Sequence, residues 1–409
     1  MIESLAIGIA GGGIGGLAAA LAVSRAGCHV QVLERAAAFS EVGAGVQLGP
    51  NVTRVLDGWG LTRALARVAA FPGQLQVRSA EGGKPLGELA LGAAMVTRYG
   101  APYATVHRAD LHALLLQAVQ QTAGVNVRAG SALRSFTQMG SSVEVRTESG
   151  LELACCALIG ADGLWSVVRQ QMLGDGPPRR TGHLAYRALV NQAALPSTLR
   201  TNDVTVWLGR HLHVVQYPVR GGEQLNVVAF VHGEVADDAS ARVDWDHSAN
   251  KRELLAAMGG TCAGLRDLME AIPHWRLWVM YDRPGMRGAH QHALSRVALL
   301  GDAAHPMRPY LAQGAGMAIE DAAELGYALS SAQAGTFDTP ALLQRYAINR
   351  WQRNARVQAR ALRNGEIFHA TGPMRWGRDA SLKLLGAKVL DMPWLYGGGG
   401  HAKVSGSRP

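Results

Sequence analysis

A glycine-rich turn near the N-terminus constrains the fold of this chain more than any other feature. Residues 11–16 read GGGIGG, so Gly11, Gly13 and Gly16 satisfy the GxGxxG spacing. The first glycine permits the bend, the second lets a pyrophosphate approach the backbone, and the third lets the helix pack on the strand. Glu34 supplies a carboxylate that can accept ribose hydroxyls. The surrounding pattern predicts a strand over 5–10, a helix over 17–25 and a second strand over 29–33. Together these features predict a dinucleotide site in a βαβ unit.

The same N-terminal segment could be mistaken for a membrane span. Residues 4–23 carry no charged side chain, but only Glu3 precedes them, so the basic region of a signal peptide is missing. Glycines also interrupt the run. The βαβ unit explains the segment better, and we expect no membrane span.

Composition and charge limit the class of protein. Of the 409 residues, 48% are hydrophobic and 17% are charged, which is typical of a globular protein with an ample core. The net charge of +9 favours anionic cofactors or substrates, although it is also compatible with solubility alone. No basic run interleaved with aromatic residues indicates nucleic-acid binding. The cysteines form neither a CxxC pair nor a metal-binding spacing, so we expect reduced thiols in a cytoplasmic protein. These cysteines are Cys28, Cys155, Cys156 and Cys262.

Two later segments repeat the order of buried strand, glycine and carboxylate. Residues 158–163 read LIGADG and contain Asp162, and residues 299–302 read LLGD and end at Asp302. Ligands of open α/β sheets bind at the carboxyl ends of the strands, so a carboxylate there can hold a sugar-like hydroxyl. Both segments also have a purely structural interpretation. Glycine-rich turns between strand and helix occur in many α/β proteins, and Asp162 can cap the next helix.

The segment after Asp302 adds a second glycine-rich turn. A loop over 305–309 reads HPMRP, and residues 313–316 read QGAG before a predicted helix over 317–329. Glycines just before a helix let a ligand approach free backbone N–H groups, which favour electron-rich atoms.

The middle of the chain changes from helical patterns to alternating strands. Strand-like runs occur at 183–191, 204–208, 212–219 and 225–232, with a strand pair over 75–91 and a helical patch over 251–272. We therefore predict an α/β fold, with a Rossmann-like dinucleotide-binding domain, an inserted, mostly antiparallel β-sheet substrate domain and a C-terminal helical segment. The predicted bounds are 1–74, 100–180 and 281–340 for the dinucleotide-binding domain, 75–99 and 181–280 for the sheet domain, 341–396 for the helical region and 397–409 for a disordered tail.

Arginines recur every three or four residues in the predicted C-terminal helix and therefore share one face. They are Arg350, Arg353, Arg356, Arg360 and Arg363. We interpret this face as solvated, with contact to an acidic partner as the alternative.

Three motifs occur in one order along the chain: GGGIGG with Glu34, GADG at 160–163 and GDAAHP at 301–306. Together they resemble the single-component FAD-dependent monooxygenases, the family of p-hydroxybenzoate hydroxylase, over nearly the whole chain. The sequence is most similar to the branch with salicylate hydroxylase, 3-hydroxybenzoate 6-hydroxylase and 6-hydroxynicotinate 3-monooxygenase. The segments that carry this similarity are GAGVQLGPN at 43–51, VHRADLHALL at 106–115, AQGAGMAIEDA at 312–322 and PWLYG at 393–397.

The resemblance implies FAD as the cofactor and NADH or NADPH as the co-substrate. It assigns the pyrophosphate to the glycine turn, the adenosine ribose to Glu34, the ribityl chain to Asp302, and the flavin ring to backbone amides of the second turn. The cofactor-binding residues that it implies are Gly11, Gly13, Gly15, Gly16, Glu34, Arg35, Gln47, Arg108, Leu133, Asp162, Asp302, Gly316 and Met317.

The resemblance also implies catalytic residues on the predicted strand over 212–219. Alternation puts His213 and Tyr217 on one face of that strand, and in this branch a His and a Tyr of the strand face the substrate. A histidine of the core or surface is the alternative for His213. His305, in the GDAAHP motif, is a third catalytic candidate, although it can instead position Pro306 beside the flavin. Gln47 stands where the 6-hydroxynicotinate enzyme has a histidine, which argues against that substrate.

The implied reaction is the hydroxylation of a hydroxylated aromatic carboxylic acid with O₂ through a flavin C4a-hydroperoxide. The candidate substrates are of the salicylate, 3-hydroxybenzoate or 6-hydroxynicotinate type. The alternatives are a flavin-dependent epoxidase, another oxidoreductase of this fold, or a non-catalytic FAD-binding sensor. A homodimer is compatible with the sequence.

Overall fold

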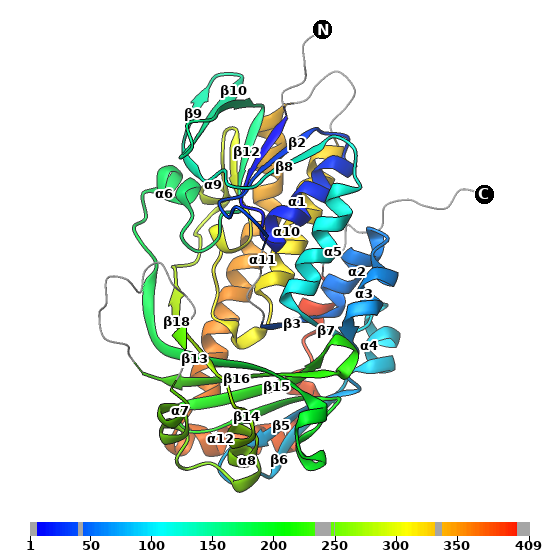
Figure 1. Cartoon of the computed structure of the whole chain (residues 1–409), viewed down its shortest axis with the longest axis vertical. Helices are drawn as coiled ribbons and strands as arrows, with labels where there is room; N and C mark the ends of the chain where they lie inside the picture. The colour runs from blue at the N-terminus through cyan, green and yellow to red at the C-terminus, as the bar shows by residue number, and fades with distance from the viewer. Residues whose placement is uncertain (1–5, 40–43, 234–246, 249, 332–337, 399–409) are drawn as a thin grey trace, which may run out of the picture.

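The structure is a computed structural model that describes residues 6–39, 44–233, 247–248, 250–331 and 338–398. A six-stranded sheet forms the upper part of the molecule in Figure 1, in the order β19-β20-β12-β1-β2-β8. The strands from β20 to β8 are parallel, and β19 pairs antiparallel with β20 at one edge. Their bounds are β1 (Ile7–Ala10), β2 (Val30–Leu33), β8 (Val125–Arg128), β12 (Ala157–Gly160), β19 (Ala293–Leu294) and β20 (Val297–Leu299).

The central strands of this sheet are buried on both faces, as their continuous apolar runs predict. Ile9 and Ile159 pack on one face with helices α1 (Ile14–Arg25), α5 (Arg108–Gln120) and α10 (Gly314–Ser330). Leu158 packs on the other face with α6 (Val167–Leu173) and a three-stranded sheet. That small sheet contains β9 (Leu133–Met139), β10 (Ser142–Thr147) and β11 (Glu152–Cys155).

Close contact between α1 and α10 depends on Gly326. A Cβ at this position would lie 2.8 Å from the carbonyl oxygen of Ala22, so only glycine lets the two helices cross at this distance. The crossing holds the beginnings of α1 and α10 side by side, and both beginnings carry glycine-rich turns.

The lower part of the molecule is an eight-stranded sheet in the order β17-β18-β13-β16-β15-β14-β5-β6 (Figure 1). All neighbouring strands are antiparallel except the parallel pair β14 and β5. The predicted strand pair over 75–91 is confirmed as β5 and β6, which join this sheet. The bounds are β5 (Gln74–Ser79), β6 (Pro85–Ala90), β13 (Arg179–Asn191), β14 (Val204–Leu208), β15 (Leu212–Val219), β16 (Gln224–His232), β17 (His247–Ser248) and β18 (Arg276–Asp282).

The two faces of this sheet have different partners. Leu184, Leu212 and Val214 pack against helices α7 (Lys251–Ala257) and α8 (Ala263–Ala271), which replace the single helical patch predicted over 251–272. Alternation turns His213 and Tyr217 to the other face, where Tyr217 packs in one cluster with Met317 of α10 and His213 lies against the ring of Tyr310. The sheet domain therefore presents its polar residues to the segment that carries the glycine turns.

The 30-residue helix α11 (Thr339–Phe368) joins the two parts (Figure 1). Tyr346 packs in the core of the parallel sheet, and Phe368 packs on Phe230 of the large sheet. The chain continues into α12 (Gly372–Leu385), α13 (Ala387–Leu390) and α14 (Pro393–Tyr396). Residues 399–409 of the predicted tail lie outside the described residues, whereas the N–H of Gly398 bonds to the oxygen of Leu395 at 3.1 Å.

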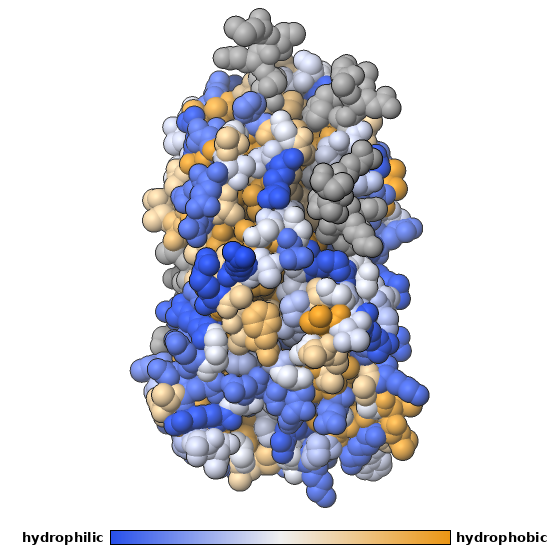
Figure 2. All heavy atoms as spheres, turned by 90° about the vertical axis from the view of Figure 1, so that its right-hand side faces the viewer, coloured by the Kyte–Doolittle hydropathy of each residue, from blue (hydrophilic) through white to orange (hydrophobic). Residues whose placement is uncertain are grey.

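Several short elements lie along the edge where the two parts meet. They are β3 (Gly45–Leu48), β4 (Ala69–Ala70), β7 (Ala104–His107), α2 (Pro50–Gly58), α3 (Thr62–Val68) and α4 (Gly92–Tyr99). Helix α9 (Ala289–His292) lies instead in the upper part, beside β19. Hydrophilic residues cover most of the face that includes α2, α3 and α4, and hydrophobic residues form separate small areas on it (Figure 2). Within the described ranges, no helix combines the length and the apolar character that crossing a membrane requires.

The α/β fold class with a second, mostly antiparallel sheet and a C-terminal helical segment is confirmed. The domain bounds themselves stay a prediction.

Candidate active site

The first glycine turn forms an open cradle at the beginning of α1. A Cβ on Gly13, the N-cap residue, would meet nothing within 4 Å, whereas a Cβ on Gly16 would lie 1.9 Å from the oxygen of Gly11. Gly11 has a φ of 103°, and Gly15 packs beside Leu300. The turn therefore leaves space at Gly13, where the helix N-terminus favours an anion, and the other glycines shape it. These residues fit a pyrophosphate, as the GxGxxG spacing predicts.

Glu34 ends β2 beside this cradle. Its carboxylate accepts the backbone N–H of Gly12 at 2.6 Å and that of Ala36 at 2.7 Å. A carboxylate has about four lone-pair positions, so this side chain is held in place and can still accept ribose hydroxyls. Leu133 packs near Leu33 in the same cluster, while Arg35 is exposed. Their contacts with an adenosine stay predictions.

Asp162 occupies the position of a helix cap. Its carboxylate accepts the hydroxyl of Ser166 at 2.5 Å and the backbone N–H groups of Val167 at 2.7 Å and Val168 at 3.1 Å. Burial raises the pKa of Asp162 despite these bonds. The contacts of Asp162 are therefore those of a residue that caps helix α6. Its contact with FAD or NAD(P)H stays a prediction.

Asp302 lies in the short turn Gly301–Ala303 that follows β20. The side chain is accessible to solvent, yet surrounding protein raises the pKa of its carboxyl by desolvation, and His305 and Arg108 oppose this shift. A carboxyl group that solvent can reach, but that the surrounding protein largely desolvates, is typical of a ligand-binding site. Arg108, at the beginning of α5, therefore acts electrostatically on Asp302, and its contact with FAD stays a prediction.

Helix α10 begins earlier than predicted, and this changes the candidate donors for a flavin ring. It starts at Gly314 rather than at Met317, and the Met317 N–H donates to the oxygen of Gln313 at 2.8 Å. The first turn of a helix supplies N–H groups without intrahelical partners. Gly316 lies in that turn and stays a candidate, whereas the Met317 N–H is already engaged.

The large sheet carries a row of polar side chains on the face opposite to α7 and α8. Register places His213 beside Phe230, and Tyr217 beside Asn226, on the same face of β15 and β16. The same face of β13 carries Arg187, which pairs with Val228. The sequence alternates in β13 as well, but only the pairing with β16 shows that Arg187 shares a face with His213 and Tyr217. Arg187 was not among the predicted site residues.

Tyr217 and Arg187 are held in defined surroundings. Tyr217 is 4% exposed, and burial raises the pKa of its hydroxyl, with Arg187 and Gln47 opposing the shift. Gln47 also accepts the hydroxyl of Tyr103 at 2.6 Å, so it links β3 to this row. The guanidinium of Arg187 lies 3.7 Å from the centre of the Trp278 ring. Tyr217 stays protonated at neutral pH and can donate a hydrogen bond.

His305 lies in a different, fully buried network. Its Nε2 lies 2.5 Å from Oδ2 of Asp321, and its backbone N–H donates to Gly301 at 2.8 Å. Its described contacts share no residue with those of His213. The structure therefore does not bring His305 to the row of His213 and Tyr217, and its contacts suit a residue that shapes the turn carrying Asp302.

The prediction of a solvated arginine face on α11 is wrong for Arg350 and Arg353. Arg350 is 5% exposed and bonds Asp321 at 2.7 Å and Glu320 at 3.0 Å. Arg353 also bonds Glu320, at 2.6 Å. The acidic partner is α10 of the same chain, and a single sequence does not show which helix packs against which.

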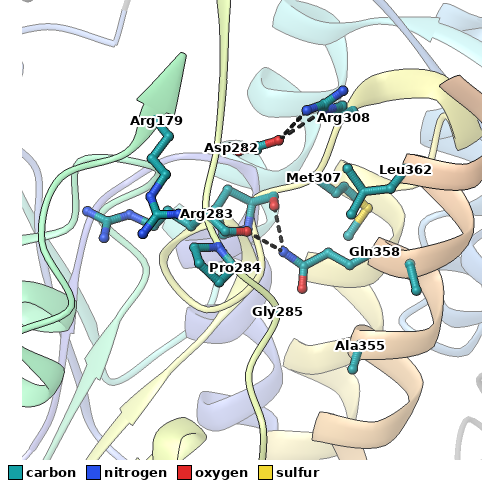
Figure 3. A pocket seen from close by; sticks show the side chains of 12 residues that line it. Arg179, Asp282, Arg283, Pro284, Gly285, Met307, Arg308, Ala355, Gln358 and Leu362 are labelled. Carbon is teal, nitrogen blue, oxygen red and sulfur yellow. Dashed lines mark hydrogen bonds and ion pairs between the residues drawn. The ribbon is translucent and has the colours of Figure 1, made fainter. Parts of the chain in front are cut away.

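A cavity of about 240 Å³ lies between α11 and the loop after β20 (Figure 3). On one side of the cavity, Gln358 donates to the oxygen of Pro306 at 2.7 Å. On another side of the cavity, Arg308 pairs with Asp282. Its lining contains neither His213 nor Asp302, so it borders the Pro306 loop from the α11 side.

Comparisons with known proteins agree with this geometry. A family model described as "FAD binding domain" matches residues 4–361. The chain is 39% identical over 391 residues to 3-hydroxybenzoate 6-hydroxylase of Polaromonas naphthalenivorans (strain CJ2), covering 95% of each chain. It is 36% identical over 392 residues to 3-amino-4-hydroxybenzoate 2-monooxygenase of Streptomyces platensis, covering 96% of this chain and 95% of that one. A solved substrate complex of salicylate hydroxylase superposes with a TM-score of 0.81 at 25% identity, covering 97% and 96% of the two chains.

Three observations point to the same cofactor. They are the open cradle at Gly13, the accessible carboxylate of Asp302 and the family match over most of the chain. This chain belongs to the FAD-binding domain family and is an FAD-dependent monooxygenase that uses NADH or NADPH as co-substrate.

Proposed function

We propose that this monooxygenase hydroxylates a benzoate that carries a phenolic hydroxyl group. The observation that carries the proposal is the common face of His213, Tyr217 and Arg187 on the large sheet. An imidazole can accept a phenol proton, and a guanidinium pairs with a carboxylate through two parallel hydrogen bonds. The substrates named for the relatives, 3-hydroxybenzoate, 3-amino-4-hydroxybenzoate and salicylate, all combine these two groups.

The spacing of the row suits one aromatic ring. Strand β16 separates β13 from β15, and His213 is offset by two residues from the position opposite Arg187, so the backbones of Arg187 and His213 are roughly 12 Å apart. Their side chains shorten this span, and a benzoate ring with both substituents can bridge it. The ring of Trp278 supports the guanidinium plane and favours a fixed orientation of the bound carboxylate.

Each residue of the row has a separate task. Bound FAD, reduced by NADH or NADPH, supplies the activated oxygen. His213 accepts the phenol proton, because burial keeps its pKa well below the usual value and the ring neutral. Tyr217 donates a hydrogen bond to the substrate, and Val215 and Phe230 on the same face exclude water.

The test is a panel of hydroxybenzoates scored for NAD(P)H oxidation and for a product that gains one oxygen. In Arg187→Met, KM for the accepted acid should rise roughly 10- to 150-fold with little change in kcat, because a hydrogen-bonded charge pair contributes about 1.5–3 kcal/mol. Arg179→Met, an exposed position on the same strand, is the matched control. A phenol without the carboxylate should not distinguish Arg187→Met from the wild type. Equal KM values for the acid would overturn the assignment of Arg187, and stimulated oxidation that yields only hydrogen peroxide across the panel would overturn the reaction.

The proposal includes a cytoplasmic location and a homodimer. The four cysteines are free thiols, which supports a reducing compartment. Light scattering on the purified enzyme tests the dimer, and fractionation of the source cells tests the location.

A further inference from the structure

A chain of histidines leads from the substrate row of the large sheet to the surface of the molecule. Nδ1 of His213 lies 2.7 Å from Nε2 of His369, and Nδ1 of His369 lies 2.8 Å from Nε2 of His232. His213 is 1% exposed, His369 is 6% exposed, and His232 lies at the surface. Each link uses a different ring nitrogen of His369, so one hydrogen-bonded path runs from the buried His213 to His232 at the surface.

We propose that His213, His369 and His232 form a proton relay that carries the proton of a bound phenol from the substrate pocket to solvent. The inference rests on the proposed function, because the relay needs a phenolic substrate at Nε2 of His213. Neither His369 nor His232 need touch the substrate; both act through His213.

The proton balance follows from the two links. The phenol proton bonds to Nε2 of His213, while the Nδ1 proton of His213 moves to Nε2 of His369. The Nδ1 proton of His369 moves to Nε2 of His232, and the Nδ1 proton of His232 leaves to water. Each ring accepts one proton and releases one, so no ring keeps a charge. The reverse transfer returns a proton to the phenolate of the product and restores the starting tautomers.

The surroundings favour passing a proton over storing one. Burial, followed by neighbouring histidines, lowers the pKa of His369 to about 3, and burial lowers the pKa of His213 well below its usual value. A base that cannot hold a proton at neutral pH still assists ionisation if the proton moves on. His369 lies at the carboxyl end of α11, where the helix dipole stabilises a transient positive charge.

The backbone holds the three rings in register. The N–H of His211 donates to the oxygen of His369 at 3.4 Å, and the N–H of His232 donates to the oxygen of His211 at 3.2 Å. Other titratable or charged groups that face the relay are His183 on β13, Tyr310 beside His213, the His211 ring beside His232, and Arg308.

A metal site is the competing interpretation, because His183, His232 and His369 could converge on one ion. Three features argue against it. Nδ1 of His183 is bonded to the hydroxyl of Tyr310, His369 uses both of its nitrogens in the chain, and Arg308 adds a positive charge nearby. A cation would therefore break existing bonds and be repelled.

The test measures phenolate formation by stopped-flow absorbance when the holoenzyme binds the hydroxybenzoate that it hydroxylates, beginning with 3-hydroxybenzoate. In His232→Ala and His369→Gln, the rate should fall at least about 10-fold, given that general-base assistance contributes about 10²- to 10⁴-fold. Added imidazole should restore His232→Ala in proportion to its concentration, because the missing ring is at the surface. It should not restore the buried His369→Gln. His211→Gln, the exposed neighbour outside the chain of bonds, should match the wild type, as should the FAD content of every variant.

The outcomes separate this inference from the proposed function. A wild type that ionises and hydroxylates the acid, together with equally fast His232→Ala and His369→Gln, overturns the relay alone. A wild type that hydroxylates no member of the panel overturns both. A rate that is lost on dialysis against a chelator and restored by Zn²⁺ overturns the relay in favour of the metal site, and a rate unchanged by chelation supports the relay.

Discussion

Arg350 of α11 and Asp321 of α10 form a buried ion pair, with the Nε of Arg350 donating to Oδ1 of Asp321 at 2.7 Å. The other oxygen of Asp321 faces His305 and accepts the backbone N–H of Gly301 at 3.1 Å. One carboxylate therefore ties the long helix to the turn that carries Asp302. Burial alone would raise the pKa of Asp321, but His305 and Arg350 outweigh it and hold that pKa below its usual range.

Removing the cation of this pair should destabilise the fold. Arg350→Met removes the guanidinium partner of Asp321 and leaves the buried carboxylate to His305, Asn354 and the Gly301 N–H, and breaking a buried ion pair in this way costs about 3–5 kcal/mol. Denaturant unfolding of the holoenzyme measures the loss. Arg345→Met, an exposed position on the same helix, should stay within about 0.5 kcal/mol of the wild type. A similar loss of unfolding free energy in both variants would mean that the ion pairs of Arg350 do not stabilise the fold.

Two substitutions in the first glycine turn should have different effects, one on FAD binding and the other on stability. In Gly13→Ala the new methyl meets nothing in the protein but occupies the cradle, so stability of the FAD-free protein should persist while FAD affinity falls. In Gly16→Ala the methyl would lie 1.9 Å from the Gly11 oxygen, so the protein itself should be destabilised. Thermal unfolding of the FAD-free forms and FAD titration measure the two effects. Normal FAD binding by Gly13→Ala would remove the pyrophosphate from this cradle.

Asp302 should contribute to FAD retention. A hydrogen bond to a charged group contributes about 1.5–3 kcal/mol, so Asp302→Ala should weaken FAD binding roughly 10- to 150-fold. Quenching of flavin fluorescence on titration of the FAD-free protein measures the change. Asp267→Ala, exposed on α8, serves as the control. Unchanged affinity in Asp302→Ala would exclude the predicted contact with the ribityl chain.

Loss of His213 should uncouple the reaction. His213→Ala leaves the FAD turns intact, but ionising a phenol of pKa ~10 at pH 7 costs ~4 kcal/mol without a base. Product formed per NAD(P)H consumed should therefore fall, and hydrogen peroxide should rise. Raising the pH from ~6.5 to ~9.5 should partly restore coupling, because solvent then ionises the phenol. Equal coupling of variant and wild type at every pH would remove His213 from the mechanism.

The histidine cluster should make the fold sensitive to mild acid. Burial lowers the pKa of His183 to about 4 and that of His369 to about 3, whereas an unfolded histidine takes up its proton near about 6.5. The unfolded state therefore binds more protons between these values, and stability should fall as the pH drops from about 7 to about 5. Thermal unfolding should show a smaller fall for His369→Gln than for the wild type. His29→Gln, at an exposed position, should show the same fall as the wild type, and a wild type whose stability is flat over this range would contradict the prediction.

Local patterns in the sequence determined the dinucleotide turn and the class of fold. The order of strand, glycine and helix around Gly11 is dictated within a few residues by backbone sterics, so it is readable without the rest of the chain. The same holds for alternation in β15, which puts His213 and Tyr217 on one face.

Only the tertiary structure decided which elements face each other. Pairing of β13 with β16 brought Arg187 beside the row of His213, and packing of α11 on α10 turned Arg350 from a predicted surface residue into a buried partner of Asp321. The start of α10 at Gly314 engaged the Met317 N–H, and His305 turned to Asp321 instead of to the substrate row. Each outcome depends on contacts between residues distant in sequence, because a helix or strand pattern shows that a face is buried but not what lies against it.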